Sequence, residues 1–266
     1  MRVKVIGIGC IGGSMALKLL DLGYDVEVYD VNGETLEMAK ERGLIVSPDG
    51  AMSGDLNIIA VPMNVEEKIL KEIKTDSLVM DVSSVMTPFI ELANSKGLRF
   101  IGGHPMAGNE RKGHEGWDEG MFEGRKFFLC EGKYTNSGDR RIVEKLVESL
   151  GSTPVWMGPL EHDRIVSKIS QSIFFISLTA KMVGKDHEEF AGPGYISTTR
   201  LSKQNVEMVL DMVRYNGENI AEDLRKGVEF LGEILEIVES KNYEKLKERM
   251  MFQRGCENQS REENPR

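Results

Sequence analysis

The sequence has few cysteines and no excess of positive charge, and each of these features argues against particular kinds of site or partner. Its three cysteines, Cys10, Cys130 and Cys256, are an odd number, and none lies in a C-x-x-C motif. This spacing argues against a zinc site or structural disulfides and favours a reducing, cytoplasmic compartment. The formal net charge of -9 argues against nucleic acid or an anionic membrane as a partner. An anionic substrate would need local cations to overcome this charge.

Long uninterrupted hydrophobic runs are also missing. The most apolar stretch, residues 169–183, contains Ser170, Gln171 and Lys181, so we expect no membrane-spanning helix. A β-branched run begins directly after Arg2, which leaves no room for a signal peptide. A hydrophobic content of 40% in 266 residues is sufficient to bury the core of one domain and a smaller partner, or of two modest domains.

Strand and helix patterns alternate in the first part of the chain. Short β-branched runs predict strands, and apolar residues at helical spacing predict the helices between them. The expected strands are residues 3–8, 26–29, 56–61, 78–82, 99–102, 126–130 and 153–156, and the main expected helices are 11–22, 34–42, 65–73 and 140–150. This alternation predicts right-handed β-α-β units and a mostly parallel sheet.

A glycine-rich turn lies between the first expected strand and the first expected helix. Residues 7–14 (GIGCIGGS) fit the pattern G-x-G-x-x-G. Gly7 would permit the tight turn, Gly9 would let the backbone approach a pyrophosphate, and Gly12 would let the helix pack close to the strand. The pyrophosphate would lie at the helix N-terminus, where free N–H groups favour negative charge.

An acidic residue at the end of the second expected strand favours one dinucleotide over the other. Asp30 lies 18 residues after Gly12, where a carboxylate can accept hydrogen bonds from ribose hydroxyls. The same carboxylate would repel a 2′-phosphate, and the next residues, Val31 and Asn32, supply no arginine. We therefore predict a Rossmann-type domain that binds NAD rather than NADP. A glycine turn without a ligand is the alternative.

Strand patterns disappear after Pro159. Apolar residues recur at helical spacing over residues 162–183 and 206–238, with a stretch rich in Gly, Pro, Ser and Thr at 190–203. We predict an α/β protein with a Rossmann-type domain at residues 1–158 and an all-helical domain at residues 159–251. Residues 252–266 are predicted to be a mobile tail or linker remnant. The long apolar faces of residues 206–238 suggest burial against a second subunit.

Only four histidines can supply an imidazole base: His104, His114, His162 and His187. His104 follows two glycines at the end of an expected strand, so its ring would stand at the carboxyl edge of the sheet, where α/β ligands bind. A loop histidine satisfied by local hydrogen bonds is an equal alternative at this position. His162 begins a long helix beside Asp163, which favours a capping or packing role. His114 and His187 lie among charged residues and are expected on the surface.

Several segments together resemble the prephenate/arogenate dehydrogenase family. The most specific is GGHPMAGNE at residues 102–110. The glycine turn, DVSSV at 81–85, His162-Asp163 and TTRL at 198–201 also fit. The resemblance implies a Rossmann domain followed by a helical domain that forms a homodimer. It also implies the NAD-dependent oxidative decarboxylation of prephenate to 4-hydroxyphenylpyruvate, with release of CO2, in tyrosine biosynthesis.

The resemblance also assigns roles to individual residues. His104 would accept a hydrogen bond from the ring hydroxyl and take its proton, and Ser84 would orient that hydroxyl. Arg200 would bind a substrate carboxylate, for which a planar guanidinium is well suited, although the residue alone is typical of a surface arginine at a helix end. The remaining implied contacts are Ser170 and Gln171 to the substrate, and Ile11, Val61 and Pro62 to the cofactor, beside Gly7, Gly9, Gly12 and Asp30.

Three positions depart from the family pattern. Many relatives carry Ser-His-x-x-His on the long helix, where this chain has Gln171 and Phe174 in place of the histidines. A lysine often found two residues after the Ser84 position is Met86. Phenylalanine cannot form the hydrogen bonds of a histidine, so the choice between prephenate and arogenate stays open. Feedback inhibition by tyrosine, the subunit number and a larger fusion also stay open.

Two other functions are compatible with the pattern. A dehydrogenase of the β-hydroxyacid type would use a lysine base on the first long helix, where Lys168 and Lys181 lie. A module that senses NAD without chemistry would be expected to lack the polar strand ends, but Ser84 and His104 are both present. Metal-ligand spacing is absent from the sequence, so we expect no metal.

Overall fold

The computed structural model describes residues 1–109 and 111–251. Contacts divide the chain into one compact unit within residues 1–219 and a second that begins at Ile220. The expected tail at residues 252–266 and Cys256 lie outside the described residues. Within the described part, no helix combines the length and the apolar character that a bilayer span requires.

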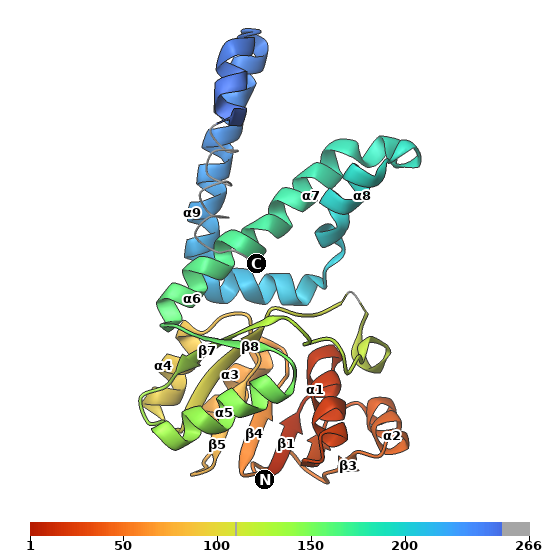
Figure 1. Ribbon diagram of the computed structural model, residues 1–266, viewed down its shortest axis with the longest axis vertical. Helices are drawn as coiled ribbons and strands as arrows, with labels where there is room; N and C mark the ends of the chain where they lie inside the picture. Colours follow the sequence, from red (N-terminus) through yellow and green to blue (C-terminus); the bar gives the residue numbers. More distant parts are fainter. Residues whose placement is uncertain (110, 252–266) are drawn as a thin grey trace. The chain divides into compact units, whose positions relative to one another are not determined.

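An eight-stranded sheet forms the centre of the first unit (Figure 1). Its order is β3-β2-β1-β4-β5-β6-β7-β8, and β7 runs antiparallel to β6 while the other neighbouring strands pair in parallel. The strands are β1 (Arg2–Ile6), β2 (Asp25–Tyr29), β3 (Ile45–Val46), β4 (Leu56–Ile59), β5 (Leu78–Asp81), β6 (Phe100–Pro105), β7 (Lys126–Glu131) and β8 (Thr153–Trp156). The predicted Rossmann-type, mostly parallel sheet is confirmed. The two-residue β3 is missing from the prediction because it is too short to create a pattern.

Helices connect these strands as the alternating pattern predicts. They are α1 (Cys10–Asp21), α2 (Gly33–Glu41), α3 (Met63–Glu72), α4 (Thr87–Ser95), η1 (Gly113–Gly116) and α5 (Ser137–Ser149). Two begin at asparagine caps: the Asn32 side chain accepts from the Thr35 amide at 2.9 Å, and Asn136 forms a reciprocal capping box with Asp139. These caps satisfy donors that the first helical turn leaves unpaired.

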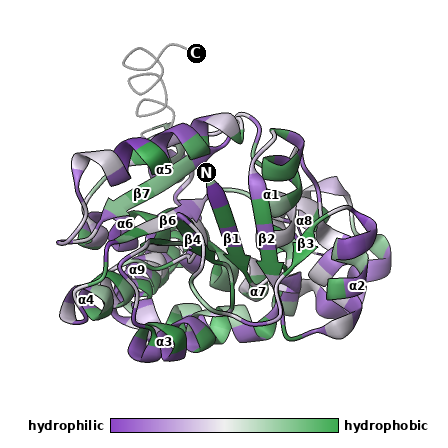
Figure 2. Cartoon of the chain, turned by 90° about the horizontal axis from the view of Figure 1, so that it is seen from below, coloured by the Kyte–Doolittle hydropathy of each residue, from purple (hydrophilic) through white to green (hydrophobic). Residues whose placement is uncertain are grey.

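The hydrophobic core lies on both faces of the central strands. Val3 and Val5 on β1 and Leu56 and Ile58 on β4 have no exposed surface, and Figure 2 shows these strands as mainly hydrophobic. Burial of such a side chain stabilises the fold by about 1.5–3 kcal/mol. A rigid sheet of this kind fixes the positions of the residues that follow its carboxyl ends.

The order in which successive strands are added to the sheet reverses at β1. The connection from β1 leads to β2 on one side, whereas β4 pairs with β1 on the other side. Such a switch point opens a crevice at the carboxyl ends of the strands, where α/β proteins bind their ligands. The glycine turn follows β1, and β4, β5 and β6 end in turn beside it.

The chain from Pro159 onward is helical within the described residues, as predicted. Its elements are α6 (Pro159–Val166), η2 (Ser167–Gln171), α7 (Ser172–Gly184), η3 (Lys185–Phe190), α8 (Pro193–Thr199), η4 (Arg200–Lys203) and α9 (Val206–Glu239). The expected single helix over residues 162–183 is interrupted because η2 is a π-helical turn, a feature that often marks functional sites. The second long helix, α9, contains non-helical backbone at Asn216, with φ of -134°.

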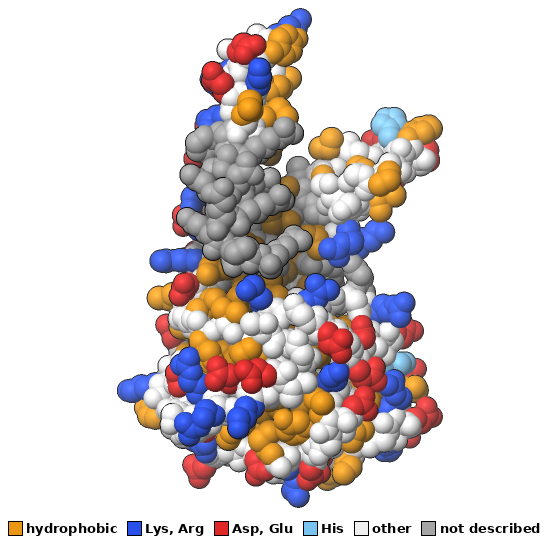
Figure 3. Space-filling model, in the orientation of Figure 1, with side chains coloured by type: hydrophobic (Ala, Val, Ile, Leu, Met, Phe, Trp, Pro, Cys, Tyr) orange, Lys and Arg blue, Asp and Glu red, His pale blue; other side chains and the backbone are white. Residues whose placement is uncertain are grey.

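Large apolar side chains remain exposed on α7, η3 and α8. Val183 is 85% exposed and Phe190 is 79% exposed. Other exposed members are Ile173, Ile176, Met182 and Ile196. Figure 3 shows such side chains on the arm that α7 and α8 form. A surface of this kind is typical of an interaction site rather than of free solvent-facing helices.

The second unit contains the C-terminal part of α9 and a helical segment at residues 243–251. The chain turns between them at Lys241, whose φ is 51°. Arg249 forms an ion pair with Glu233, which joins the two segments. Val228, Leu231, Leu235 and Val238 are exposed on this part of α9.

Candidate active site

At two of the three glycines in the turn after β1, a side chain would clash with neighbouring backbone atoms. Gly7 has φ of +87°, and a Cβ there would lie 2.5 Å from the Ala60 carbonyl oxygen. A Cβ on Gly12 would lie 2.0 Å from the Gly7 carbonyl oxygen. Gly9 differs, because a Cβ there would meet no described atom within 4 Å. The backbone at Gly9 therefore faces open space, as a pyrophosphate cradle requires.

The start of α1 and the end of β2 supply groups that suit a dinucleotide. Gly9 is the N-cap of α1, and no described side chain caps the helix, so the first amides can bind an anion. Asp30 accepts from the Ile8 amide at 2.8 Å and from the Asn32 amide at 2.9 Å. Each carboxylate oxygen retains capacity for a further hydrogen bond from a ribose hydroxyl.

Trp117 lies against the glycine turn, a contact that the sequence gives no signal for. Its indole N–H donates to the carbonyls of Ile8 and Gly9 at 3.0 and 3.1 Å. A Cβ on Gly13 would lie 1.8 Å from the indole nitrogen. This contact brings the segment after the His104 loop onto the nucleotide turn. Of the other predicted cofactor contacts, Ile11 and Val61 are half-buried and Pro62 is exposed.

His104 and His162 form a direct contact at the carboxyl end of β6. His104 Nδ1 lies 3.0 Å from His162 Nε2, and His162 Nδ1 lies 2.9 Å from Asp163 Oδ1. His162 has no exposed surface, whereas His104 is half-buried. Asp163 also accepts from the amides of Met86 and Thr87 at 2.8 and 2.9 Å. The packing role predicted for His162 therefore includes a contact with the candidate base.

The chain of contacts selects one tautomer for each ring. Burial alone would raise the pKa of Asp163, but hydrogen bonds from His162, Thr87 and Met86 lower it, so this group is a carboxylate that accepts from His162 Nδ1–H. His162 Nε2 is then unprotonated and accepts from His104 Nδ1–H. His104 Nε2 is left with a free lone pair. Burial, followed by the neighbouring His162, lowers the pKa of His104 to about 3, so the ring is neutral near pH 7.

Ser84 follows β5 and is linked to the same cluster through its backbone. Its hydroxyl lies 4.0 Å from the Met63 sulfur, a weak contact. Its carbonyl accepts from the Gln171 side chain at 3.0 Å, and the Gln171 oxygen accepts from Asn216 at 2.7 Å. The buried Gln171, one of the departures from the family pattern, therefore joins the Ser84 segment to η2 and α9.

The remaining predicted substrate contacts lie on the helical part. Arg200 is exposed at the start of η4, which packs against α7 through the Ser202 amide and the Ser177 hydroxyl. Ser170 is half-buried in η2. The described contacts join Gln171 to Ser84 but do not join Arg200 to the histidines. His114 is half-buried in η1 and His187 is exposed in η3.

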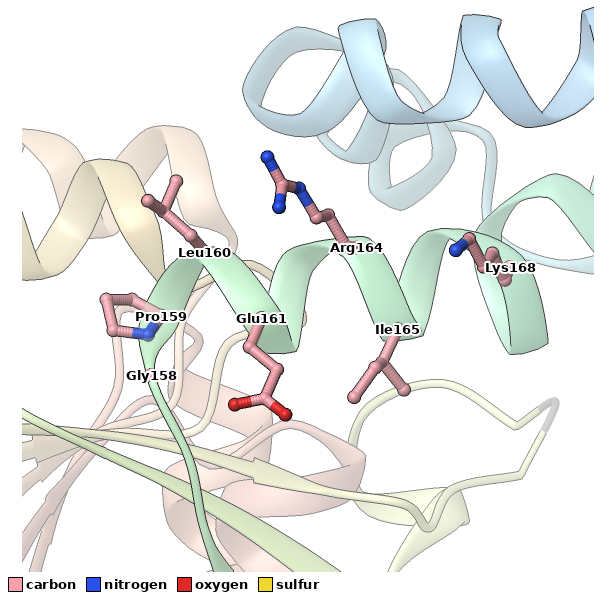
Figure 4. Close-up of a pocket in the computed structure, with 7 residues that line it drawn as sticks. All are labelled: Gly158, Pro159, Leu160, Glu161, Arg164, Ile165 and Lys168. Carbon is pink, nitrogen blue, oxygen red and sulfur yellow. The ribbon is translucent and has the colours of Figure 1, made fainter.

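No described hydrogen bond or ion pair joins the two lysines of the competing interpretation to His104 or His162. Lys181 forms an ion pair with Glu188. Lys168 lines a hollow of about 500 Å³ along α6, together with Gly158, Pro159, Leu160, Glu161, Arg164 and Ile165 (Figure 4). The hollow contains neither His104 nor Ser84. His162 and Asp163 lie on the buried face of α6, away from it, so the hollow is not the candidate active site.

Comparisons with known proteins cover both parts of the chain. Residues 15–155 match the family "Prephenate dehydrogenase, nucleotide-binding domain", and residues 158–252 match "Prephenate dehydrogenase, dimerization domain". The chain is 27% identical over 254 residues to the prephenate dehydrogenase of Lactococcus lactis subsp. cremoris (strain MG1363), covering 88% of this chain and 70% of that protein. It is 28% identical over 271 residues to the prephenate dehydrogenase of Bacillus subtilis (strain 168), covering 92% and 72%.

A solved structure shares the same fold over nearly the whole length. Prephenate dehydrogenase from A. aeolicus in complex with hydroxyphenyl propionate and NAD+ superposes with a TM-score of 0.86 at 26% identity. The match covers 99% of this chain and 98% of that chain. The similarity therefore includes the sheet, the strand ends and the helices after Pro159.

Proposed function

Because the chain belongs to the prephenate dehydrogenase family, an oxidoreductase family, we propose that it catalyses the NAD-dependent oxidative decarboxylation of prephenate to 4-hydroxyphenylpyruvate. One observation carries the proposal: the His104–His162–Asp163 chain, with contacts of 3.0 and 2.9 Å, stands at the sheet edge that also carries the glycine turn. An NAD-sensing module would have no use for an imidazole lone pair held in this way.

NAD is the proposed cofactor because the residues present fit it. Gly9 leaves open space for a pyrophosphate, and Gly7, Gly12 and Ile11 shape the turn around it. We expect Asp30 to accept hydrogen bonds from the ribose hydroxyls, and Val61 and Pro62 follow β4 beside the turn. When bound, NAD would accept the hydride from the carbinol carbon of the substrate.

Two alanine substitutions in the turn are expected to separate folding from cofactor binding. Gly12→Ala puts a methyl group 2.0 Å from a backbone oxygen, so we expect a loss of stability of about 3 kcal/mol, seen as a lower melting temperature. Gly9→Ala meets no described atom within 4 Å, so stability should change by less than about 0.5 kcal/mol. Its KM for NAD should rise at least about tenfold, because the methyl group occupies the cradle. Equal melting temperatures for the two variants would contradict this assignment.

His104 and Ser84 are the proposed catalytic residues. His104 Nε2 would accept the proton of the ring hydroxyl as electrons leave the carbinol carbon, and the Ser84 hydroxyl would orient that oxygen. The product keeps its hydroxyl, so His104 returns the proton to the phenolic oxygen. The new aromatic ring supplies the driving force for loss of CO2, so the protein needs only to position the ring and polarise the hydroxyl.

A bound dianion would make His104 a better base than it is in the free protein. The low pKa of the free ring results first from burial and then from His162. Negative charge on a bound substrate favours the imidazolium form and would raise this pKa. The base would therefore gain strength when prephenate is present.

Arg200 is the proposed anchor for a substrate carboxylate. A protein of net charge -9 needs a local cation for a dianion, and a guanidinium can bind a carboxylate with two hydrogen bonds. We expect Arg200→Gln to lower kcat/KM for prephenate by about 10- to 100-fold, mainly through a higher KM. A loss of this size corresponds to the free energy of one hydrogen bond to a charged group. Lys203→Gln in the same short helix is the matched control. An unchanged KM for prephenate would exclude Arg200 as the anchor.

Substrate preference depends on the side-chain end of the pocket. Ser170 and Gln171 are the proposed contacts there. Measured kcat/KM values for prephenate and arogenate, each with NAD and NADP, test the assignment. We expect the highest value with prephenate and NAD. A higher value with arogenate would transfer the assignment to arogenate dehydrogenase, and turnover of neither substrate would reject the function.

We also propose that the chain forms a homodimer through its helical part. The match to a dimerization domain over residues 158–252 and the exposed apolar side chains on α7, η3, α8 and α9 support this. Light scattering should give the mass of two chains. A mass of 29.8 kDa, that of one chain, would contradict the proposal.

A further inference from the structure

Two buried acids lie beside the proposed catalytic residues but take no part in the proposed proton and hydride transfer. Glu66 on α3 and Asp81 at the end of β5 have no exposed surface. The two carboxyl groups are within hydrogen-bonding reach of each other. Burial raises the pKa of both, and for Glu66 the neighbouring Asp81 charge raises it further. At neutral pH two adjacent buried carboxyls of this kind cannot both ionise.

Each acid has one oxygen that accepts a hydrogen bond from the chain. The Ser83 hydroxyl donates to Glu66 Oε2, and the Gly103 amide donates to Asp81 Oδ1 at 2.7 Å. The other oxygens, Glu66 Oε1 and Asp81 Oδ2, are buried and accept from no other described group. No cation is among the main influences on the pKa of either acid within the described residues.

A single proton between Glu66 Oε1 and Asp81 Oδ2 would remove both the repulsion between two carboxylates and the lack of a hydrogen bond at these oxygens. It satisfies both buried oxygens with one hydrogen bond and leaves the pair with one negative charge. That charge is then stabilised by the donors from Ser83 and Gly103. The pair therefore connects α3, the end of β5 and the end of β6 at one buried point.

The two donors are direct neighbours of the proposed catalytic residues. Ser83 precedes Ser84, and Gly103 precedes His104. We propose that Glu66 and Asp81 share one proton and act as a positioning pair that holds the Ser84 and His104 segments at their working separation. The proposal rests on the proposed function for its effect on catalysis, but the shared proton itself does not.

Substitutions of Glu66 test the positioning role. Glu66→Gln can donate an N–H to Asp81 Oδ2 and still accept from Ser83, so kcat should fall by less than about threefold. Glu66→Met fills a similar volume but offers no acceptor to Ser83 and no donor to Asp81. Its kcat should fall by about 10- to 100-fold, because small misplacements of catalytic groups are costly, while KM for NAD changes by less than about twofold.

Glu72→Met makes the same change at an exposed position of the same helix and is the matched control for α3. Melting temperatures of all variants separate misplacement from unfolding. Equal losses of kcat in Glu66→Gln and Glu66→Met, or no loss in Glu66→Met, would overturn the positioning role.

Infrared spectroscopy of the free protein tests the shared proton without any substrate. At neutral pH the wild type should show the C=O stretch of a protonated carboxylic acid. That band should shift or be lost in Glu66→Gln and in Asp81→Asn, because each substitution removes one of the two carboxyl groups that share the proton. A missing band in the wild type, or a band unchanged in both variants, would reject the pair. If the wild type shows this band but does not turn over prephenate, the proposed function is rejected and the shared proton is retained.

Discussion

Replacement of His104 by asparagine is expected to lower kcat for prephenate oxidation by about 10²- to 10⁴-fold, the usual cost of losing a general base. Asparagine can still donate an N–H toward His162 Nε2, which lies 3.0 Å from the native ring. It has no lone pair basic enough to take a proton from the substrate hydroxyl. The loss should therefore appear in kcat, whereas KM for NAD should change little, because the glycine turn is untouched.

A second histidine provides the control for this substitution. His114→Asn changes a half-buried residue in η1 and should leave turnover within about twofold of the wild type. The melting temperature of each variant shows whether the fold is retained. Near-normal turnover in His104→Asn would remove the proposed role of His104.

The second large effect is expected at Asp163, which does not contact the substrate in this account. Asp163→Asn can present an amide N–H to His162 Nδ1, and the hydrogen-bond chain then reverses. His162 would donate from Nε2 to His104 Nδ1, so the proton of His104 would move to Nε2, the atom that must act as the base. We expect kcat to fall by at least about 10²-fold, although no group at the substrate has changed.

The tautomer can be observed directly. Nitrogen NMR of histidine-labelled protein distinguishes a protonated Nδ1 from a protonated Nε2. The wild type should show His104 protonated at Nδ1, and Asp163→Asn should show it protonated at Nε2. Because Asp163 also accepts from Met86 and Thr87, the melting temperature must be measured in parallel. Wild-type turnover in a stable Asp163→Asn variant would contradict the tautomer account.

Much of the nucleotide-binding fold is predictable from the sequence because its determinants are local. β-Branched runs predict strands, and Gly7, Gly9 and Gly12 predict the turn from their spacing alone. The antiparallel β7 and the π-helical turn η2 are not predictable in this way. Both depend on how distant segments pack, and Lys126–Glu131 has the same apolar pattern as the parallel strands.

The candidate site shows the same division between local and distant causes. His104 is predicted at the end of a strand from its neighbours, but its partner His162 is 58 residues away. The sequence around His162 indicates only a helix start, and the contact exists because α6 packs beside the carboxyl end of the sheet. Gln171 appears in the sequence as a lost histidine, and the structure adds its bond to the Ser84 carbonyl.

The acids of the positioning pair also illustrate what pattern alone leaves out. Asp81 ends a predicted strand, but Glu66 lies in a helix among other charged residues, where a glutamate is typical of a solvated face. Its burial follows from α3 packing onto the sheet, with the Glu66 side chain turned toward Asp81 and Ser83. No single-residue property distinguishes it from the half-buried Glu67 or the exposed Glu72.

The most direct test of the central claim is the stoichiometry of products formed from prephenate and NAD by the purified wild-type protein. If an imidazole at the sheet edge removes the hydroxyl proton while the carbinol carbon is oxidised, then NADH, CO2 and 4-hydroxyphenylpyruvate should appear in equal amounts. NADH formation without release of CO2, or the absence of any reduction of NAD, would contradict the account.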